Sequence, residues 1–407
     1  MPNLGVYIHI PFCASKCLYC DFYSLPDASD KLMDSYVKAL IRHMDEASHY
    51  MGKGSKGGVA LDTVYFGGGT PTVLGPARLG ELLSALRKRF NLVTSPEITV
   101  EANPGTVTLK TLKKLRKAGF NRISIGVQAL QSNLLQTLGR THTGEQAADA
   151  VRDAAEAGFL NISADILYGI PGQTRAQFSE TLRAVCTWRL THISLYGLKL
   201  EEGTPLAAAD PVLPGDDEQA DCYLAAVDLL RQEGFQQYEI SNFAKRGYLC
   251  RHNYKYWTLE PYVGFGAAAH SDFGSKRYSI VKDIRAYVSK MQEGEAVIEE
   301  SQAIPMSERA GEYVMLGLRT ANGVSSNEYT RLFRASFDSL ENKLERCAKW
   351  GLAETEGDRW HLTPKGFLVS NQIIGELLNT GDNPQSPKKD AEKPSRSDGA
   401  SSEQRID

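Results

Sequence analysis

Six short stretches rich in β-branched and aromatic residues alternate with helix-like segments in the first half of this chain. The stretches are 4–10, 61–67, 97–102, 121–127, 161–169 and 191–197. Between the first two, a helical repeat places large apolar side chains on one face, namely Met33, Tyr36, Val37, Leu40, Ile41 and Met44. This alternation predicts an α/β fold with a parallel sheet and right-handed crossovers. A doubly wound sheet and a partial α/β barrel both fit, and both place a functional site at the carboxyl ends of the strands.

The chain divides by composition into four parts. Residues 1–200 form the expected core, and residues 201–300 are a less regular extension with one helix expected around 216–233. In residues 301–380, helices at about 307–320, 325–335 and 338–350 precede a hairpin and a last helix, which predicts a small winged-helix-like α+β module. Residues 381–407 contain almost no apolar side chains, so we expect a disordered tail.

Charge and hydropathy exclude several classes of function. The 407 residues carry a formal net charge of -3, which gives no electrostatic reason to expect binding to nucleic acid or to an anionic membrane surface. The winged-helix-like module also lacks a basic excess, because residues 306–379 contain nine Lys and Arg against ten Asp and Glu. No apolar run is long enough to span a bilayer, and no secretory signal precedes the first strand, so we expect a cytoplasmic protein.

Three of the seven cysteines are close together. Cys13, Cys17 and Cys20 follow the first predicted strand with the spacing C-x3-C-x2-C, whereas Cys186, Cys222, Cys250 and Cys347 are scattered and are expected to be buried small side chains. Structural zinc needs four ligands, and His9 could be the fourth only by pointing back from the strand. An iron–sulfur cluster is the stronger interpretation, because a 4Fe-4S cluster on three thiolates keeps one iron open for a substrate or cofactor.

Polar groups also follow the other predicted strands. The glycine run "YFGGGTP" (65–71) ends the second strand, Glu101 ends the third, Gln128 ends the fourth with Arg140 just beyond, and Asp165 lies in the fifth. Each group alone is more often a helix cap or a solvent-exposed residue. Because parallel strands end at the same edge, the set together predicts a pocket beside the cysteine loop.

The cysteine spacing is the signature of the radical S-adenosylmethionine (SAM) superfamily. The longer string "YIHIPFCASKCLYCDF" resembles the oxygen-independent coproporphyrinogen III oxidase family, and the resemblance covers roughly residues 3–375. It implies a partial (β/α)6 barrel, a 4Fe-4S cluster on Cys13, Cys17 and Cys20, and SAM bound to the open iron.

The same resemblance implies which residues line the SAM pocket. They are Tyr7, Gly68, Gly69, Thr70, Glu101, Gln128, Arg140 and Asp165. In the family the glycine motif binds the amino group of SAM, so a side chain at Gly69 is expected to weaken SAM binding and to spare the cluster. On chemical grounds we assign Arg140 to a carboxylate and Asp165 to a ribose.

Two departures from the oxidase point to a different branch of the family. The oxidase has a fourth cysteine two residues after the third, where this chain has Phe22. The oxidase also has a long arm before its first strand, whereas the first predicted strand here begins at residue 4. In addition, "HNYKYW" (252–257) matches the HNxxYW motif of a haem-chaperone branch, in which the histidine is implicated in haem binding. His252 is therefore the predicted haem ligand, and Cys250 is a nearby alternative.

The sequence therefore predicts a haem chaperone that binds a 4Fe-4S cluster, SAM and haem. Such a protein would need an electron donor and would deliver haem to acceptor proteins such as respiratory enzymes. Two alternatives remain open at this point: a coproporphyrinogen III oxidase, and a zinc-stabilised binding module without redox chemistry.

Overall fold

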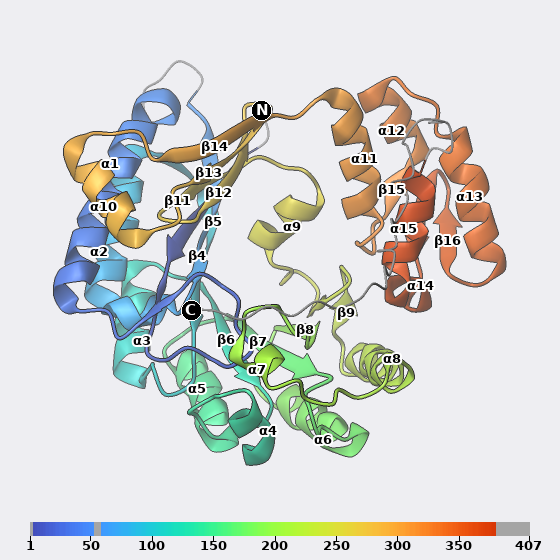
Figure 1. The fold of residues 1–407 in the computed structure, drawn as a ribbon, viewed down its shortest axis with the longest axis horizontal. Helices are drawn as coiled ribbons and strands as arrows, with labels where there is room; N and C mark the ends of the chain where they lie inside the picture. The colour runs from blue at the N-terminus through green and yellow to red at the C-terminus, as the bar shows by residue number, and fades with distance from the viewer. Residues whose placement is uncertain (1–2, 53–57, 380–407) are drawn as a thin grey trace, which may run out of the picture.

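The core of the computed structural model, which describes residues 3–52 and 58–379, is a large curved sheet (Figure 1). The six predicted strands are present as β1 (Leu4–Ile10), β4 (Ala60–Gly68), β5 (Asn91–Ala102), β6 (Arg122–Gln128), β7 (Asn161–Tyr168) and β8 (His192–Gly197). They pair in parallel and lie side by side in chain order. A doubly wound sheet would reverse its strand order partway, so the order confirms the partial barrel. The predicted tail, 381–407, lies outside the described residues.

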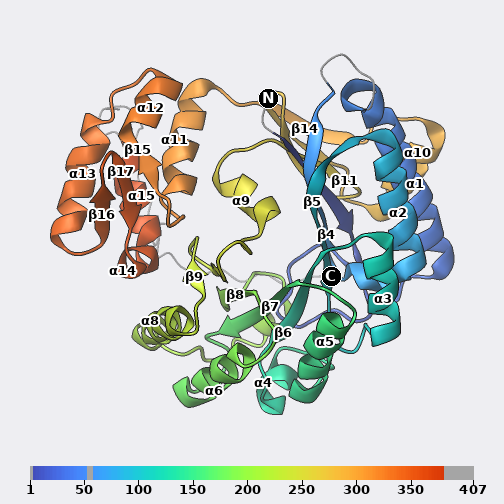
Figure 2. The same cartoon turned by 180° about the vertical axis from the view of Figure 1, so that it is seen from behind.

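The crossover helices cover the outer, convex face of the sheet (Figures 1 and 2). They are α1 (Asp30–Met51), α2 (Gly75–Arg89), α3 (Leu109–Ala118), α4 (Ser132–Thr137), α5 (Gly144–Glu156) and α6 (Arg175–Cys186). Five of the six side chains predicted for the apolar face of α1 are buried, and Ile41 is half-buried. Gly119 ends α3 with a φ of 112°, which a residue with a Cβ rarely adopts, so this glycine stops the helix before β6.

The two faces of the central strands differ in chemistry. Residues such as Val6, Val64 and Ile98 are buried toward the helices. The alternate positions carry polar or aromatic side chains, including Tyr65 and Asp165. Because side chains alternate across a strand, this pattern places the polar groups on the concave inner face of the barrel.

Further strands, which the sequence analysis did not predict, extend both ends of the sheet. β11 (Tyr262–Phe265) pairs in parallel with β1 and is followed by β12 (His270–Phe273), β13 (Lys276–Ile280) and β14 (Ile298–Ala303). At the other end of the sheet, β10 (Asn242–Ala244) pairs with β8, and β9 (Gln236–Gln237) pairs with β10 and forms the edge of the sheet. The same region contains α7 (Pro205–Ala208), the predicted helix α8 (Asp216–Gln232), α9 (Arg251–Trp257) and α10 (Ile284–Glu293).

The helix α9 lies on the inner side of the sheet, between the barrel and the C-terminal module (Figure 1). That module contains α11 (Met306–Gly317), β15 (Val324–Ser325), α12 (Ser326–Phe333), α13 (Asp338–Lys349), β16 (Ala353–Glu356), β17 (Arg359–Leu362), α14 (Pro364–Leu368) and α15 (Ser370–Leu378). Its helices and its small sheet, in the order β15-β17-β16, have the predicted winged-helix-like character. The expected last helix is divided into α14 and α15 at Val369. In the described part of the chain, no helix is both long and apolar enough to cross a membrane.

Candidate cofactor site

A cavity of about 400 Å³ opens at the carboxyl ends of the central strands. Its walls include the predicted residues Cys13, Cys17, Cys20, Gly68, Gly69, Thr70, Glu101, Gln128, Arg140 and Asp165. Its volume is in the range of sites that enclose small molecules. Of the residues predicted to line the SAM pocket, Tyr7 alone does not line this cavity, and its ring packs against Tyr65 with 6.2 Å between the centroids.

The cysteine loop is attached to the glycine loop by backbone hydrogen bonds. Cys13 ends the short strand β2 (Phe12–Cys13), which pairs with β3 (Leu25–Pro26). The Gly69 N–H donates to the Ile10 carbonyl at 2.9 Å, and the Thr70 N–H donates to the Phe12 carbonyl at 2.7 Å. These contacts place the Cys13 sulfur 3.6 Å from the Thr70 hydroxyl, so thiol and glycine loop form one wall.

The chemistry of this wall fits an iron–sulfur cluster. Among residues 3–52 and 58–379, no three His, Cys, Asp or Glu side chains are placed to hold a single metal ion. A 4Fe-4S cluster does not need such convergence, because each thiolate binds a different iron. Two buried polar atoms of the cavity walls, Ser24 Oγ and Arg140 Nε, also have no hydrogen-bond partner within the described structure, as expected where a bound group completes the site.

The glycine loop allows close approach to its backbone. Gly68 has a φ of +115°, and a Cβ there would lie 2.6 Å from the His9 ring. The Gly68 N–H donates to Glu101 Oε2 at 3.2 Å. The N–H groups of Gly69 and Thr70 donate to the carbonyls of the cysteine loop segment. Since the backbone donors of residues 68–70 are occupied, the loop offers a ligand acceptor oxygens, which suits an ammonium group.

Two carboxyl groups lie in the cavity wall. Glu101 accepts a hydrogen bond from the Tyr65 hydroxyl at 2.7 Å, and its burial raises its pKa to about 7. Asp165 accepts from the Ser124 hydroxyl at 3.1 Å, and burial raises its pKa also. A cationic ligand such as SAM would favour the ionised form of both groups.

Arg140 and Gln128 also line the cavity, and Asn103 links Arg140 to the Thr70 hydroxyl of the glycine loop. The Arg140 guanidinium donates to Asn103 Oδ1 at 2.6 Å and to the Tyr19 hydroxyl at 2.8 Å. Gln128 has a φ of +67°, at a point where the register between β6 and β7 shifts. Left-handed backbone at a residue other than glycine is costly and concentrates at functional sites, so this bulge marks a position whose side-chain direction matters.

His252 and Cys250 lie away from the cavity, where α9 meets the early residues of β1, β4 and β5. The His252 ring is completely buried, with Nδ1 2.9 Å from Thr63 Oγ1 and Nε2 2.9 Å from the Tyr256 hydroxyl. Burial lowers the pKa of His252 to about 3, so the ring is neutral. The buried Cys250 thiol donates to Glu97 at 3.7 Å. In this conformation neither side chain is accessible to a haem iron.

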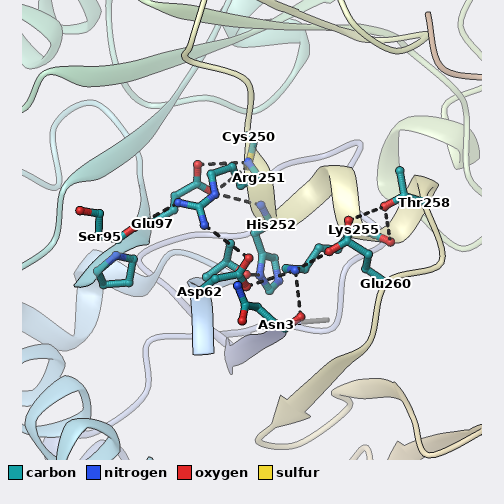
Figure 3. A network of polar contacts seen from close by, with 12 residues as sticks. Asn3, Asp62, Ser95, Glu97, Cys250, Arg251, His252, Lys255, Thr258 and Glu260 are labelled. Atoms are coloured by element: carbon teal, nitrogen blue, oxygen red, sulfur yellow. Dashed lines mark hydrogen bonds and ion pairs between the residues drawn. The ribbon is translucent and has the colours of Figure 1, made fainter. Parts of the chain in front are cut away.

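A dense polar network holds α9 in this place (Figure 3). Glu97 accepts from the backbone N–H groups of Arg251 and His252, at 3.1 and 3.0 Å. The Lys255 ammonium contacts Asp62 at 3.1 Å and Glu260 at 2.8 Å while its side chain is only 3% exposed. The position of His252 is therefore determined by charges on β4 and β5, which a motif within 252–257 cannot reveal.

Comparison with known proteins places the whole chain in one family. The family model described as "Radical SAM superfamily" matches residues 7–185, and the "HemN C-terminal domain" model matches residues 304–369. "Heme chaperone HemW" of Lactococcus lactis is 34% identical over 382 residues, which cover 93% of this chain and 97% of that protein. The chain belongs to the HemW family. The HemW proteins of Bacillus subtilis and Escherichia coli are 34% and 32% identical and are covered over 99% of their lengths.

A solved structure supports the fold of this HemW-family chain. The coproporphyrinogen III oxidase HemN of Escherichia coli, a radical SAM enzyme, superposes with a TM-score of 0.80 over 92% of this chain and 90% of that one, at 24% identity. At that identity the likeness shows the fold alone. The radical SAM match implies a 4Fe-4S cluster and SAM as cofactors.

Some cavity residues were missed in the sequence analysis. Tyr19, Asn103 and Tyr196 line the cavity beside the predicted set. Tyr19 lies inside the quoted cysteine loop, and Asn103 follows Glu101 by only two positions, so both are next to predicted residues in the sequence. Tyr196 is near the end of the sixth strand, where the strand-end argument could have found it.

Proposed function

We propose that this protein is a haem chaperone that binds a 4Fe-4S cluster, SAM and haem and delivers haem to acceptor proteins such as respiratory enzymes. The observation that carries the proposal is its similarity, over almost the full length of both chains, to proteins named heme chaperone HemW. All seven cysteines are free thiols, which supports a reducing compartment, and we propose that the protein acts in the cytoplasm.

In this proposal Cys13, Cys17 and Cys20 hold the cluster, and the carbonyl oxygens of the glycine loop bind the SAM amino group. Arg140 pairs with the SAM carboxylate, Asp165 pairs with its ribose, and Glu101, Gln128 and Thr70 complete the pocket. Tyr7 packs against Tyr65, whose hydroxyl donates to Glu101. The bound cluster would supply electron transfer to SAM, with the electrons coming from a separate donor protein.

We retain His252 as the proposed axial haem ligand, with one condition that follows from its burial. Since both ring nitrogens have partners and the ring is fully covered, ligation requires α9 to move or Tyr256 to turn away. Cys250 is the less favourable ligand, because burial raises the pKa of its thiol to about 12 and a thiolate is the metal-binding form.

A coproporphyrinogen III oxidase is the second candidate function, because this chain shares the fold of that enzyme. Phe22 argues against it. The oxidase family has a cysteine at this position, whereas here a phenyl ring, 66% exposed, lies in the cavity wall.

The experiment that separates the two functions uses anaerobically reconstituted full-length protein. We expect the protein to bind haemin with its cluster retained, and to form no protoporphyrinogen from coproporphyrinogen III with SAM and a reductant. The control variant, with Cys13, Cys17 and Cys20 changed to Ala, should lose the cluster absorption, whereas Cys186→Ala should keep it. Efficient conversion of coproporphyrinogen III would overturn the chaperone proposal.

A further inference from the structure

Arg122, the first residue of β6, is a buried cation without a contact partner. Its side chain is 2% exposed, its Nε has no hydrogen-bond partner among the described residues, and no ion pair in the described structure includes it. Burying a charge is costly unless other groups compensate it, so its surroundings must explain why it is there. The cofactor ligands proposed above do not include Arg122.

The register of the sheet places Arg122 beneath the carboxyl groups of the cofactor cavity. Arg122 pairs with Thr99 on β5, and the next inward-facing pair along the same two strands is Ser124 with Glu101. Asp165, on the other side of β6, accepts a hydrogen bond from the Ser124 hydroxyl at 3.1 Å. Because inward side chains are two residues apart along a strand, Arg122 lies one layer below Glu101 and Asp165, about 7 Å along the strand.

The other groups that face Arg122 do not neutralise it by contact. Glu97 is the carboxylate on the α9 side, and it accepts the backbone N–H groups at the start of that helix. The remaining titratable neighbours are Tyr65, Tyr238, Cys250, His192 and His252. Burial raises the pKa of the hydroxyls and the thiol and lowers the pKa of the imidazoles, so all five are neutral at pH 7.

The two cavity carboxyls are exposed to the charge of Arg122. Burial is the largest influence on Glu101 and on Asp165 and raises the pKa of each, while the positive charge of Arg122 acts in the opposite direction on both. The two carboxyls also face each other, and like charges oppose their joint ionisation. A buried cation therefore offsets both of the effects that disfavour the carboxylate forms.

No other group around the carboxyls is equally free to do this. The titratable side chains that face them from the remaining elements are Tyr7 on β1, Tyr65 on β4, Tyr196 on β8, Tyr256 on α9, and Arg140. Burial raises the pKa of each tyrosine, so these hydroxyls are neutral. Arg140 is charged, but its guanidinium donates to Asn103 and Tyr19.

We propose that Arg122 is a positioning residue of the cofactor cavity: its buried charge favours the ionised carboxylates of Glu101 and Asp165, to which a cationic ligand such as SAM binds. Arg122 does not line the cavity, so it acts through these two groups rather than by touching the ligand. An arginine suits this role because its guanidinium stays protonated when buried. The inference rests on the proposed placement of SAM and adds a residue to it.

The test is a calorimetric titration of cluster-loaded full-length protein with SAM between about pH 6 and 9. In the parent, the affinity should rise with pH as the carboxyls ionise, with a midpoint near 7. In Arg122→Met the same rise should occur at least about one pH unit higher, and SAM should bind about fivefold more weakly at pH 7, because the carboxylates have lost the cation that favours them.

Two variants control for the charge and for the substitution itself. Arg122→Lys keeps a positive charge at the same place and should keep the parental midpoint. Arg152→Met removes an arginine that is 68% exposed on the surface and should also keep it. Because Arg122→Met breaks no ion pair, the variant should fold, which circular dichroism checks, and Arg122→Gln repeats the comparison with a polar side chain.

The outcomes separate this inference from the SAM site on which it rests. The amino group of SAM titrates equally in every sample, so a difference between midpoints belongs to the protein. Parental midpoints in Arg122→Met and Arg122→Gln, or a shift in Arg122→Lys as large as in Arg122→Met, would overturn the role of Arg122 and leave the SAM site standing. If the parent itself does not bind SAM, the proposed SAM site fails.

Discussion

At the scale of single residues, the cysteine loop and the glycine loop, which carry the proposed cofactor ligands, share one wall of the cavity. A Cβ built on Gly69 would lie 2.7 Å from the Phe12 carbonyl oxygen and 3.0 Å from the Cys13 sulfur. Real Cβ atoms do not approach backbone oxygen this closely, so any side chain at Gly69 must push the cysteine loop. The expectation from the sequence, that such a side chain affects SAM and spares the cluster, needs revision for this reason.

We predict that Gly69→Ala lowers both the iron content and the SAM affinity of reconstituted protein, each by at least about threefold, since the displaced loop carries Cys13, a proposed cluster thiolate. Iron analysis and calorimetry measure the two quantities. Gly80→Ala is the control, because the nearest atom to a new Cβ there is the Ala118 Cβ at 3.5 Å. Full iron content in Gly69→Ala with SAM binding lost would show that the loops are independent.

The raised pKa of Glu101 has a consequence for stability. Its folded pKa of about 7 lies above the value of roughly 4.3 for an unfolded glutamate, so between these values the folded state binds the extra proton. Its contribution to the free energy of unfolding must therefore fall as the pH rises from about 5 to 7.

We predict that Glu101→Gln flattens this dependence in protein without SAM. The free energy of unfolding in urea is measured at pH 5 and at pH 7.5. The drop between these two values should be smaller in the variant than in the parent by on the order of 1–2 kcal/mol. Glu239→Gln should show a similar change, because burial also raises the pKa of Glu239 to about 7. Parallel pH profiles for parent and Glu101→Gln would contradict the assigned ionisation.

At the scale of elements, α9 is held in place by charged side chains that lie largely out of solvent. Burying an ammonium is costly unless its partners remain, and Lys255 is almost fully buried against Asp62 and Glu260. The carbonyl of Asn3 accepts a further hydrogen bond from Lys255 at 3.1 Å. This anchoring explains how a helix of only seven residues is stable on the inner side of the sheet (Figure 3).

We predict that Lys255→Met lowers the free energy of unfolding by about 2 kcal/mol, because Asp62, whose side chain is 11% exposed, loses its ammonium partner and keeps only Arg251 as a cation. Lys290→Met is the matched control. Its ion pair with Glu295 is exposed on both sides, 38% and 54%, and should contribute less than about 0.5 kcal/mol. Urea unfolding monitored by circular dichroism measures both, and equal midpoints for the two variants would refute the role of the anchor.

The elements also show what the sequence could and could not reveal. The six central strands were predictable because each is a β-rich run bounded by a helix with its own apolar periodicity. β9 and β10, of two and three residues, are too short to show a period, and β14 is exposed along its whole length. The carboxyl-end rule placed the three loop cysteines and every predicted pocket residue except Tyr7 at one cavity. The burial of His252, by contrast, depends on Thr63 and Tyr256, which no local pattern joins.

At the scale of the whole molecule, the C-terminal module connects the two ends of the open sheet. The Ile240 N–H donates to the Arg319 carbonyl and the Ala321 N–H to the Tyr238 carbonyl near β9, while Arg309 pairs with Asp272 on β12. α9 lies between these two attachments (Figure 1). The module thus closes the side of the barrel next to α9, and none of its residues lines the candidate cofactor cavity at the strand ends.

The central claim is that this protein gives haem to another protein, and the most direct measurement is the transfer itself. Reconstituted full-length protein loaded with one equivalent of haemin is mixed with the haem-free form of a haem-dependent respiratory enzyme, and the recovery of enzyme activity is followed with time. The account predicts recovery that is faster than with the same amount of free haemin, with the loss of haem from the loaded protein in step. Haem that stays on the loaded protein, or recovery no faster than with free haemin, would contradict it.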